Sequence, residues 1–124
     1  MQIPRPSEDV KAFFRAVVPS APGVEVKPMF GNLGAFVNGN MFAGLFGDDI
    51  GVRLLEDQSV AALAAVPGTG PFGPAERPMG GYTALPAAWR ESPEQASEWI
   101  AVALEQVGRL PVKQPKPRAA KKQA

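Results

Sequence analysis

The 124-residue chain contains no cysteine and no histidine. The first absence excludes disulfides, thiolate zinc sites and cysteine nucleophiles, and the second removes the commonest general base and metal ligand. No stretch approaches the roughly 20 apolar residues that span a bilayer, and the opening residues lack the apolar run of a signal peptide. The sequence therefore predicts a cytoplasmic protein with no metal site, no cofactor and no histidine- or cysteine-dependent catalysis.

Charge is distributed unevenly along the chain. Residues 1–108 hold seven Lys/Arg and twelve Asp/Glu, a net charge of −5, whereas residues 109–124 hold six Lys/Arg and no acid. The basic residues of this last stretch are Arg109, Lys113, Lys116, Arg118, Lys121 and Lys122. Too few apolar side chains accompany them to offset the entropy of ordering. We therefore expect a folded domain over 1–108 and a disordered, basic Pro/Lys-rich tail over 109–124.

The tail has two interpretations. Charged termini often serve only to keep a protein soluble, whereas lysines separated by prolines can neutralise successive nucleic-acid phosphates without folding. No aromatic residue lies among the charges, so stacking of bases on the tail is not expected. Weak, nonspecific binding of nucleic acid is therefore the functional alternative to solubilisation.

Apolar residues at helical spacing predict helices at both ends of the domain. The first helix follows a capping Ser7, and its apolar positions are Val10, Phe13, Phe14 and Val17. The last begins at a capping Ser92 and ends at Gly108. Its apolar stripe consists of Ala96, Trp99, Ile100, Ala103, Leu104 and Val107. A shorter helix is expected over 57–65, with three inward side chains: Val60, Leu63 and Ala64.

Between the first and second helices the pattern changes to the alternation of strands. Asn38-Gly39 is the strongest hairpin signal, because both residues tolerate the positive φ of a two-residue turn. That turn would place Phe36 opposite Met41 and Ala35 opposite Phe42.

The remaining segments complete the predicted topology. Gly47-Asp48-Asp49 offers a second turn, residues 67–81 are rich in Gly and Pro and are expected to form a loop, and 82–85 a short last strand. The order of elements predicts an α+β fold, an antiparallel sheet of about five strands with helices packed on one face.

No group of residues indicates catalysis. The adjacent acids Asp48-Asp49 and Glu56-Asp57 lie at predicted turns, where solvated carboxylates are the common case. The serines have no histidine partner, although a serine–lysine arrangement remains open. The glycines of residues 31–34 precede a strand rather than a helix, so they do not form a phosphate-binding loop. The sequence therefore predicts a protein that is not an enzyme.

Three short motifs, in order, suggest a family. They are Met29-Phe30-Gly31, then Gly39-Asn40-Met41-Phe42-Ala43, then Arg77-Pro78-Met79 with Tyr82 close behind. Over roughly residues 10–107 the chain resembles the N-terminal domain of the TfoX/Sxy family. Asn32 and Glu76 depart from the family pattern, where glycine is common.

The resemblance implies a stand-alone TfoX N-terminal-like domain. Full-length competence regulators of that family carry a second, helical domain, and their best-known role is to regulate competence genes alongside the cyclic-AMP receptor protein. That role transfers poorly to a one-domain member. The implied function is a regulatory or adaptor domain that contacts a protein partner, such as the transcription machinery.

The motif residues admit structural and functional roles. Core packing is the commoner use of Met29, Phe30, Met41, Phe42 and Met79, and an adaptable methionine-rich contact surface is the alternative. Arg77 could bond loop carbonyls or pair with Glu76 or Glu25, or, like Arg53, it could bind a phosphate or a partner carboxylate. The candidate partner- or ligand-binding residues are Met29, Phe30, Gly31, Met41, Arg53, Arg77, Pro78, Met79 and Tyr82.

Three functions remain open on the sequence. The first is a regulatory or adaptor domain that binds protein, the second a nonspecific nucleic-acid-associated protein that binds through its tail. The third is a small-ligand-binding or enzymatic domain that uses Arg53, Arg77 and Tyr82 around a pocket, which sequence cannot show. The oligomeric state is also left open.

Overall fold

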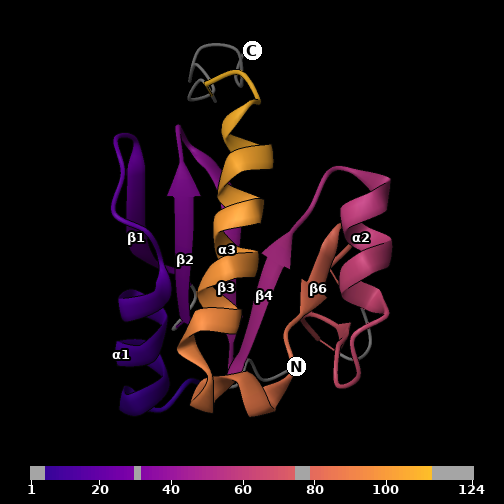
Figure 1. The fold of residues 1–124 in the computed structure, drawn as a ribbon. Coiled ribbons are helices and arrows are strands. Elements are labelled where there is room, and N and C mark those ends of the chain that lie inside the picture. Colours follow the sequence, from indigo (N-terminus) through magenta and orange to yellow (C-terminus); the bar gives the residue numbers. More distant parts are fainter. Residues whose placement is uncertain (1–4, 30–31, 75–78, 113–124) are drawn as a thin grey trace, which may run out of the picture.

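A computed structural model describes residues 5–29, 32–74 and 79–112. Along the chain the elements are α1 (Glu8–Val17), β1 (Val24–Met29), β2 (Asn32–Val37), β3 (Asn40–Phe46), β4 (Asp49–Arg53), α2 (Asp57–Ala64), β5 (Gly70–Pro71), β6 (Tyr82–Ala84), the 3₁₀ helix η1 (Ala87–Glu91) and α3 (Pro93–Gly108) (Figure 1). Within the described residues the strands form one antiparallel six-stranded sheet in the order β1-β2-β3-β4-β6-β5. The predicted α+β class is confirmed, with one more strand than expected.

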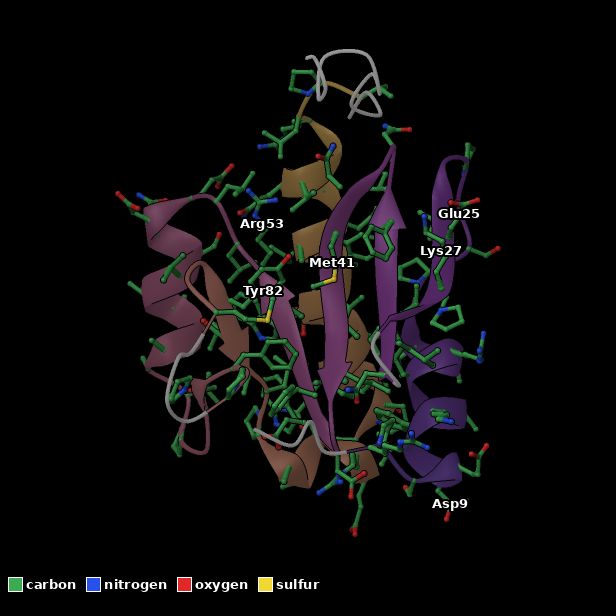
Figure 2. All side chains as sticks on the ribbon, turned by 180° about the vertical axis from the view of Figure 1, so that it is seen from behind. Asp9, Glu25, Lys27, Met41, Arg53 and Tyr82 are labelled. Carbon is green, nitrogen blue, oxygen red and sulfur yellow. The ribbon has the colours of Figure 1, made fainter. Side chains whose placement is uncertain are left out.

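The helices are arranged unevenly around this sheet. α1 and α3 lie side by side across one face, and α2 lies beside β6 near the far edge (Figure 1). Figure 2 shows the opposite face, which no helix of the described chain crosses. The core is therefore one layer between α1, α3 and the sheet, and the second face is left to side chains. None of the described helices is both long and apolar enough to cross a membrane.

α1 forms where its sequence predicts it. The Ser7 hydroxyl accepts a hydrogen bond from the backbone N–H of Val10 at 3.2 Å, which caps the helix, and two acids occupy the first turn. Val10, Phe14 and Val17 are buried, whereas Phe13 is only partly buried.

The Asn38-Gly39 turn also forms as predicted, with φ values of 52° and 85°. Phe36 lies opposite Met41, but Ala35 lies opposite Ala43 rather than Phe42. A bulge causes this error, because Phe42 is an extra residue on β3 that has no partner on β2. The extra residue lets both Phe42 and Ala43 be fully buried.

The last helix differs from expectation in which side chains it buries and in how it begins. In α3, Trp99 and Leu104 are only partly buried, and the buried tryptophan is Trp89 of η1, 9% exposed. The Ser92 hydroxyl makes no capping bond, and its carbonyl instead accepts from the N–H of Gln95.

In α2, only one residue is buried. Leu63 is fully enclosed, whereas Val60 and Ala64, both predicted to point inward, are exposed. α2 lies beside the short strand β6 rather than across the sheet, so a single side chain suffices to anchor it.

Candidate functional site

Three of the predicted site residues come together on the helix-free face of the sheet. Met41 belongs to β3, Arg53 to β4 and Tyr82 to β6 (Figure 2). Arg53 lies directly opposite Tyr82 in the strand register, and the Tyr82 hydroxyl donates a hydrogen bond to the carbonyl of Met41 at 3.2 Å. We call this surface the open face. Its members, all with partly or fully exposed side chains, are Lys27, Phe36, Met41, Phe46, Arg53 and Tyr82.

A row of paired glycines gives the open face its shape. Gly34 lies opposite Gly44, which lies opposite Gly51 on the next strand. A Cβ at Gly34 would lie 2.9 Å from the Phe36 ring and 3.1 Å from the Met41 sulfur. The absence of side chains in this row thus lets the neighbouring Phe36 and Met41 lie flat against the strands.

Phe72 fills the far end of the same row. A Cβ at Gly51 would overlap the Phe72 ring, which packs edge-on against Phe46 at 6.4 Å and beside Tyr82 at 5.9 Å between centroids. Phe72 is only 2% exposed, although it lies in the segment predicted as loop. The N–H of Met79 donates a hydrogen bond to the carbonyl of Phe72 at 2.8 Å. Sequence reasoning missed this residue, and Gly51, a glycine between the buried Ile50 and Val52, was the available signal.

Arg53 and Tyr82 form the polar part of the open face. Burial raises the pKa of Tyr82 above its usual 10.0, and the positive charge of Arg53 lowers it in part. Arg53 makes no hydrogen bond and no ion pair with any other residue that the structure describes. Its guanidinium is therefore a partly exposed cation for which the described residues supply no counter-ion.

Lys27 closes the open face at the β1 edge. Its ammonium lies 4.7 Å from the centroid of the Phe36 ring and 3.7 Å from a carboxylate oxygen of Glu25. Glu25 is thus paired with Lys27, a neighbour on its own strand.

The other motif residues are placed only in part. Met79 lies in the loop before β6, where its side chain packs against Gly73. The backbone of Met29 ends β1 and pairs with Asn32. The side chain of Met29 and all of Phe30, Gly31, Arg77 and Pro78 lie outside the described residues.

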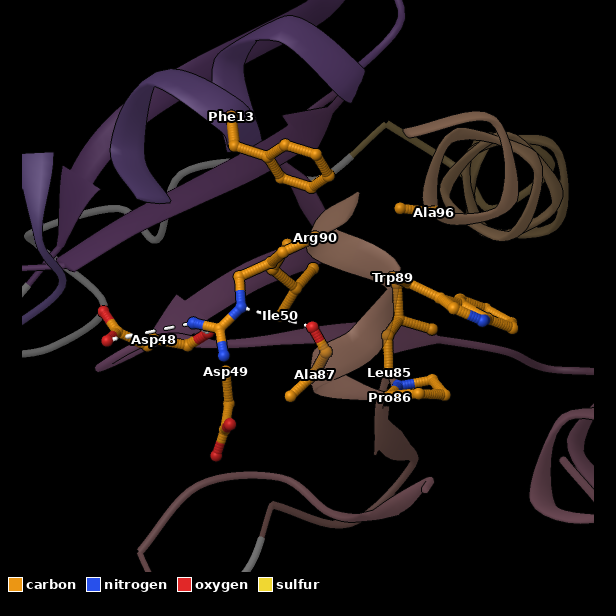
Figure 3. Close-up of a pocket in the computed structure, with 10 residues that line it drawn as sticks. All are labelled: Phe13, Asp48, Asp49, Ile50, Leu85, Pro86, Ala87, Trp89, Arg90 and Ala96. Carbon is orange, nitrogen blue, oxygen red and sulfur yellow. Dashed lines mark hydrogen bonds and ion pairs between the residues drawn. The ribbon is translucent and has the colours of Figure 1, made fainter. Parts of the chain in front are cut away.

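A small pocket lies on the opposite, helix-covered side. It is lined by Phe13, Asp48, Asp49, Ile50, Leu85, Pro86, Ala87, Trp89, Arg90 and Ala96, and it encloses about 10 Å³ (Figure 3). That volume holds about one water molecule, too little for a metabolite. Arg90 closes it by donating to the carbonyl of Ala87 at 3.3 Å and pairing with Asp48 at 3.8 Å. Arg90 thus serves the fold.

Acidic groups do not gather into a metal site in the described chain, where no cluster of three or more potential ligands occurs. Arg109, predicted as the first residue of the tail, is held at the end of α3. Its guanidinium contacts Glu56 at 2.7 Å and Glu105 at 3.1 Å, and the Glu56 hydrogen bond above all raises the pKa of Arg109. The other basic residues of the predicted tail, from Lys113 onward, lie outside the described residues.

Comparison with known proteins assigns the domain to a family. The sequence matches the family described as TfoX N-terminal domain over residues 17–107, which runs from the end of α1 to the last turn of α3. Searches of curated proteins and of solved structures gave no match. The matched segment contains the whole sheet and the open face, and the chain belongs to the TfoX N-terminal domain family.

Proposed function

We propose that this domain is a non-enzymatic regulatory or adaptor module that binds a protein partner through the open face. The observation that carries the proposal is the convergence of Met41, Arg53 and Tyr82, from three strands, on a face that no described helix covers. A sheet face that carries several half-exposed apolar side chains is typical of a surface for another molecule.

The chemistry of the open face indicates what it binds. Phe36 and Met41 offer flat apolar contact, and the flexible thioether adapts to differently shaped partners. Arg53, with no described counter-ion, favours a partner that brings a carboxylate to the same place. The complementary surface is therefore an apolar patch with an acidic residue at its rim, as in many protein–protein contacts.

The regulatory part of the proposal comes from the family. The best-known family role is control of competence genes, so we propose a component of the transcription machinery as the class of partner. Absence of cysteine and histidine supports a role in binding rather than catalysis.

Affinity capture of the full-length chain from its native cells tests this function. The variants are Arg53→Glu, on the open face, and Arg15→Glu, an exposed arginine on α1 with the same change of charge. We expect one saturable partner protein whose recovery falls about tenfold with Arg53→Glu and is unchanged with Arg15→Glu. Equal recovery with both variants would remove the open face as the binding surface.

A second candidate function rests on a separate observation, the acid-free basic stretch from Arg109 onward. We propose that its charges bind nucleic acid weakly and without sequence preference, because the remainder of the chain carries −5 and repels phosphates. In this case nuclease treatment would abolish capture of other macromolecules, whereas a protein partner of the open face would be retained.

A further inference from the structure

β1 forms one edge of the sheet, so half of its main-chain groups face away from β2. The N–H of Asn38 donates to the carbonyl of Gly23 at 3.0 Å, which shows that the main-chain groups of Gly23 point toward β2. Since this orientation alternates along a strand, Glu25 and Lys27 also point toward β2. Val24, Val26 and Pro28 therefore direct their main-chain groups outward.

Among the residues that the structure describes, only one of these three has an outward N–H without an acceptor. The N–H of Val24 already donates to the carbonyl of Ala21 at 3.1 Å, and proline has no N–H. Any strand that adds to this edge must therefore bond to the N–H of Val26. This single donor limits the registers in which a strand can pair with the β1 edge.

We propose that β1 pairs with β1 of a second copy of this chain, antiparallel, about a twofold axis that passes beside Val26. This arrangement makes the N–H of each Val26 donate to the carbonyl of Val26 in the second copy. The proposal is independent of the open-face function, and each can fail without the other.

Charge selects this register over its neighbours. If Val26 lay opposite Val24 of the second copy, Glu25 would face Glu25. If Val26 lay opposite Pro28, Lys27 would face Lys27. Only with Val26 opposite Val26 does each Glu25 face a Lys27, at positions where cross-strand side chains approach most closely. The strand is therefore complementary to itself in one register.

The side chains on both faces of the edge fit this pairing. Glu25 and Lys27 are exposed and lie together at the β1 edge of the open face (Figure 2). On the helix side, Val24 and Val26 are half-buried and line an open depression of about 270 Å³. Its other lining residues, from the end of α1 and the loop that follows, are Arg15, Val18, Pro19 and Ser20. Val26 of a second copy would lie beside this depression and cover part of its apolar surface.

The assembly closes at a dimer. Pro28 prevents the ladder from extending, so the contact is a short, reversible one. At the other edge, β5 has two residues, one of which is Pro71, and offers no comparable strand. A twofold contact also uses up the edge on both copies, which prevents growth into fibres.

Sedimentation equilibrium of the full-length protein at low salt tests the proposal. Glu25→Lys and Lys27→Glu should each raise the dimer dissociation constant about tenfold or more, because two attractive pairs become repulsive. The double variant restores opposite charges and should return the constant to within about threefold of wild type. An equimolar mixture of the two single variants should also associate.

Controls separate this contact from general charge effects and from misfolding. Glu94→Lys changes the net charge by the same amount as Glu25→Lys. Glu94 lies exposed on α3, so this variant should leave dimerisation unchanged. Val26→Pro removes the outward donor and should abolish the dimer, with circular dichroism as the check of folding. A monomeric wild-type protein, single reversals without effect, or a double variant that stays dissociated would each overturn the proposal.

Discussion

Replacing Gln106 by leucine tests how α3 holds the start of α2. Gln106 is 5% exposed, and its Oε1 accepts hydrogen bonds from the N–H groups of Leu55 at 2.7 Å and Glu56 at 3.0 Å. Its Nε2 donates to the Ser59 hydroxyl at 2.8 Å. Glu56 occupies the N-cap position of α2 but makes no capping bond with its own side chain. A glutamine from α3 therefore holds the two residues that lead into α2.

Leucine is similar in size but has no polar atom. The Gln106→Leu variant leaves two main-chain N–H groups without an acceptor and the Ser59 hydroxyl without its donor. A fully buried unsatisfied group costs about 1–3 kcal/mol. These groups are only partly buried, so water replaces some of the lost bonds. We expect a loss of about 2–4 kcal/mol in the free energy of unfolding.

Urea and thermal unfolding measure this loss. For a domain of this size we expect the melting temperature to fall by roughly 8–20 °C. Gln95→Leu is the matched control, because Gln95 is an exposed glutamine in the first turn of the same helix, and it should change stability by less than about 0.5 kcal/mol. If Gln106→Leu and Gln95→Leu were equally stable, the role of Gln106 in holding the start of α2 would be refuted.

Three further predictions concern the open face and the tail. Gly51→Ala should lower the free energy of unfolding by about 1–3 kcal/mol, because its methyl group overlaps the Phe72 ring, whereas Gly80→Ala, in open space, should be nearly neutral by urea unfolding; equal effects would contradict this packing. Tyr82, the single tyrosine, should titrate above pH 10.0 by ultraviolet absorbance, and higher still in Arg53→Gln. The contribution of Tyr82 to the free energy of unfolding should be constant below pH 10.0. It should fall as the pH rises through the folded pKa, because the unfolded chain releases the phenolic proton first. A titration midpoint of Tyr82 at or below 10.0 would be inconsistent with a buried hydroxyl. The full-length chain should bind duplex DNA with a slope of about −4.5 in a plot of log affinity against log salt concentration, because residues 113–124 hold five Lys/Arg. Deleting these residues should abolish that binding. Full affinity in the shortened chain would exclude the tail as the DNA-binding segment.

Local signals predicted the elements that local interactions build. The Ser7 cap, the apolar spacing of α1 and the Asn38-Gly39 turn each depend on residues within a few positions, and all three form as expected. The Ala35–Phe42 pairing failed because a bulge is decided by packing, which here buries Phe42 and its neighbour Ala43 together. A period-two pattern carries no information about such an inserted residue.

Long-range contacts explain what the sequence left out. The hydrogen bonds that hold the start of α2 come from Gln106, about 50 positions further along the chain, so no local pattern indicates them. Phe72 is buried only because Gly51 leaves room for its ring on a distant strand. β5 likewise exists as a strand only through its pairing with β6. In the last two cases tertiary packing decided a feature of a segment that the sequence predicted as loop.

The sequence indicated residues of the candidate site but not that they lie together in the fold. Motif and residue type singled out Met41, Arg53 and Tyr82, yet their convergence depends on the sheet order, in which β6 rather than β5 adjoins β4. Strand alternation and the bulge also separate Met41 from Phe42, so one motif residue lies on the open face and its neighbour in the core. Packing therefore applies to Phe42, whereas contact with a partner stays a prediction for Met41.

A photo-crosslinking amino acid placed at position 41 of the full-length chain tests the role of the open face most directly. The matched control places the same amino acid at Ala101, which is exposed on α3 on the helix-covered side. We predict a single protein adduct in native cells from position 41, absent from position 101 and lost when Arg53→Glu is added. Equal labelling from both positions, or a nuclease-sensitive adduct from position 41, would contradict the account.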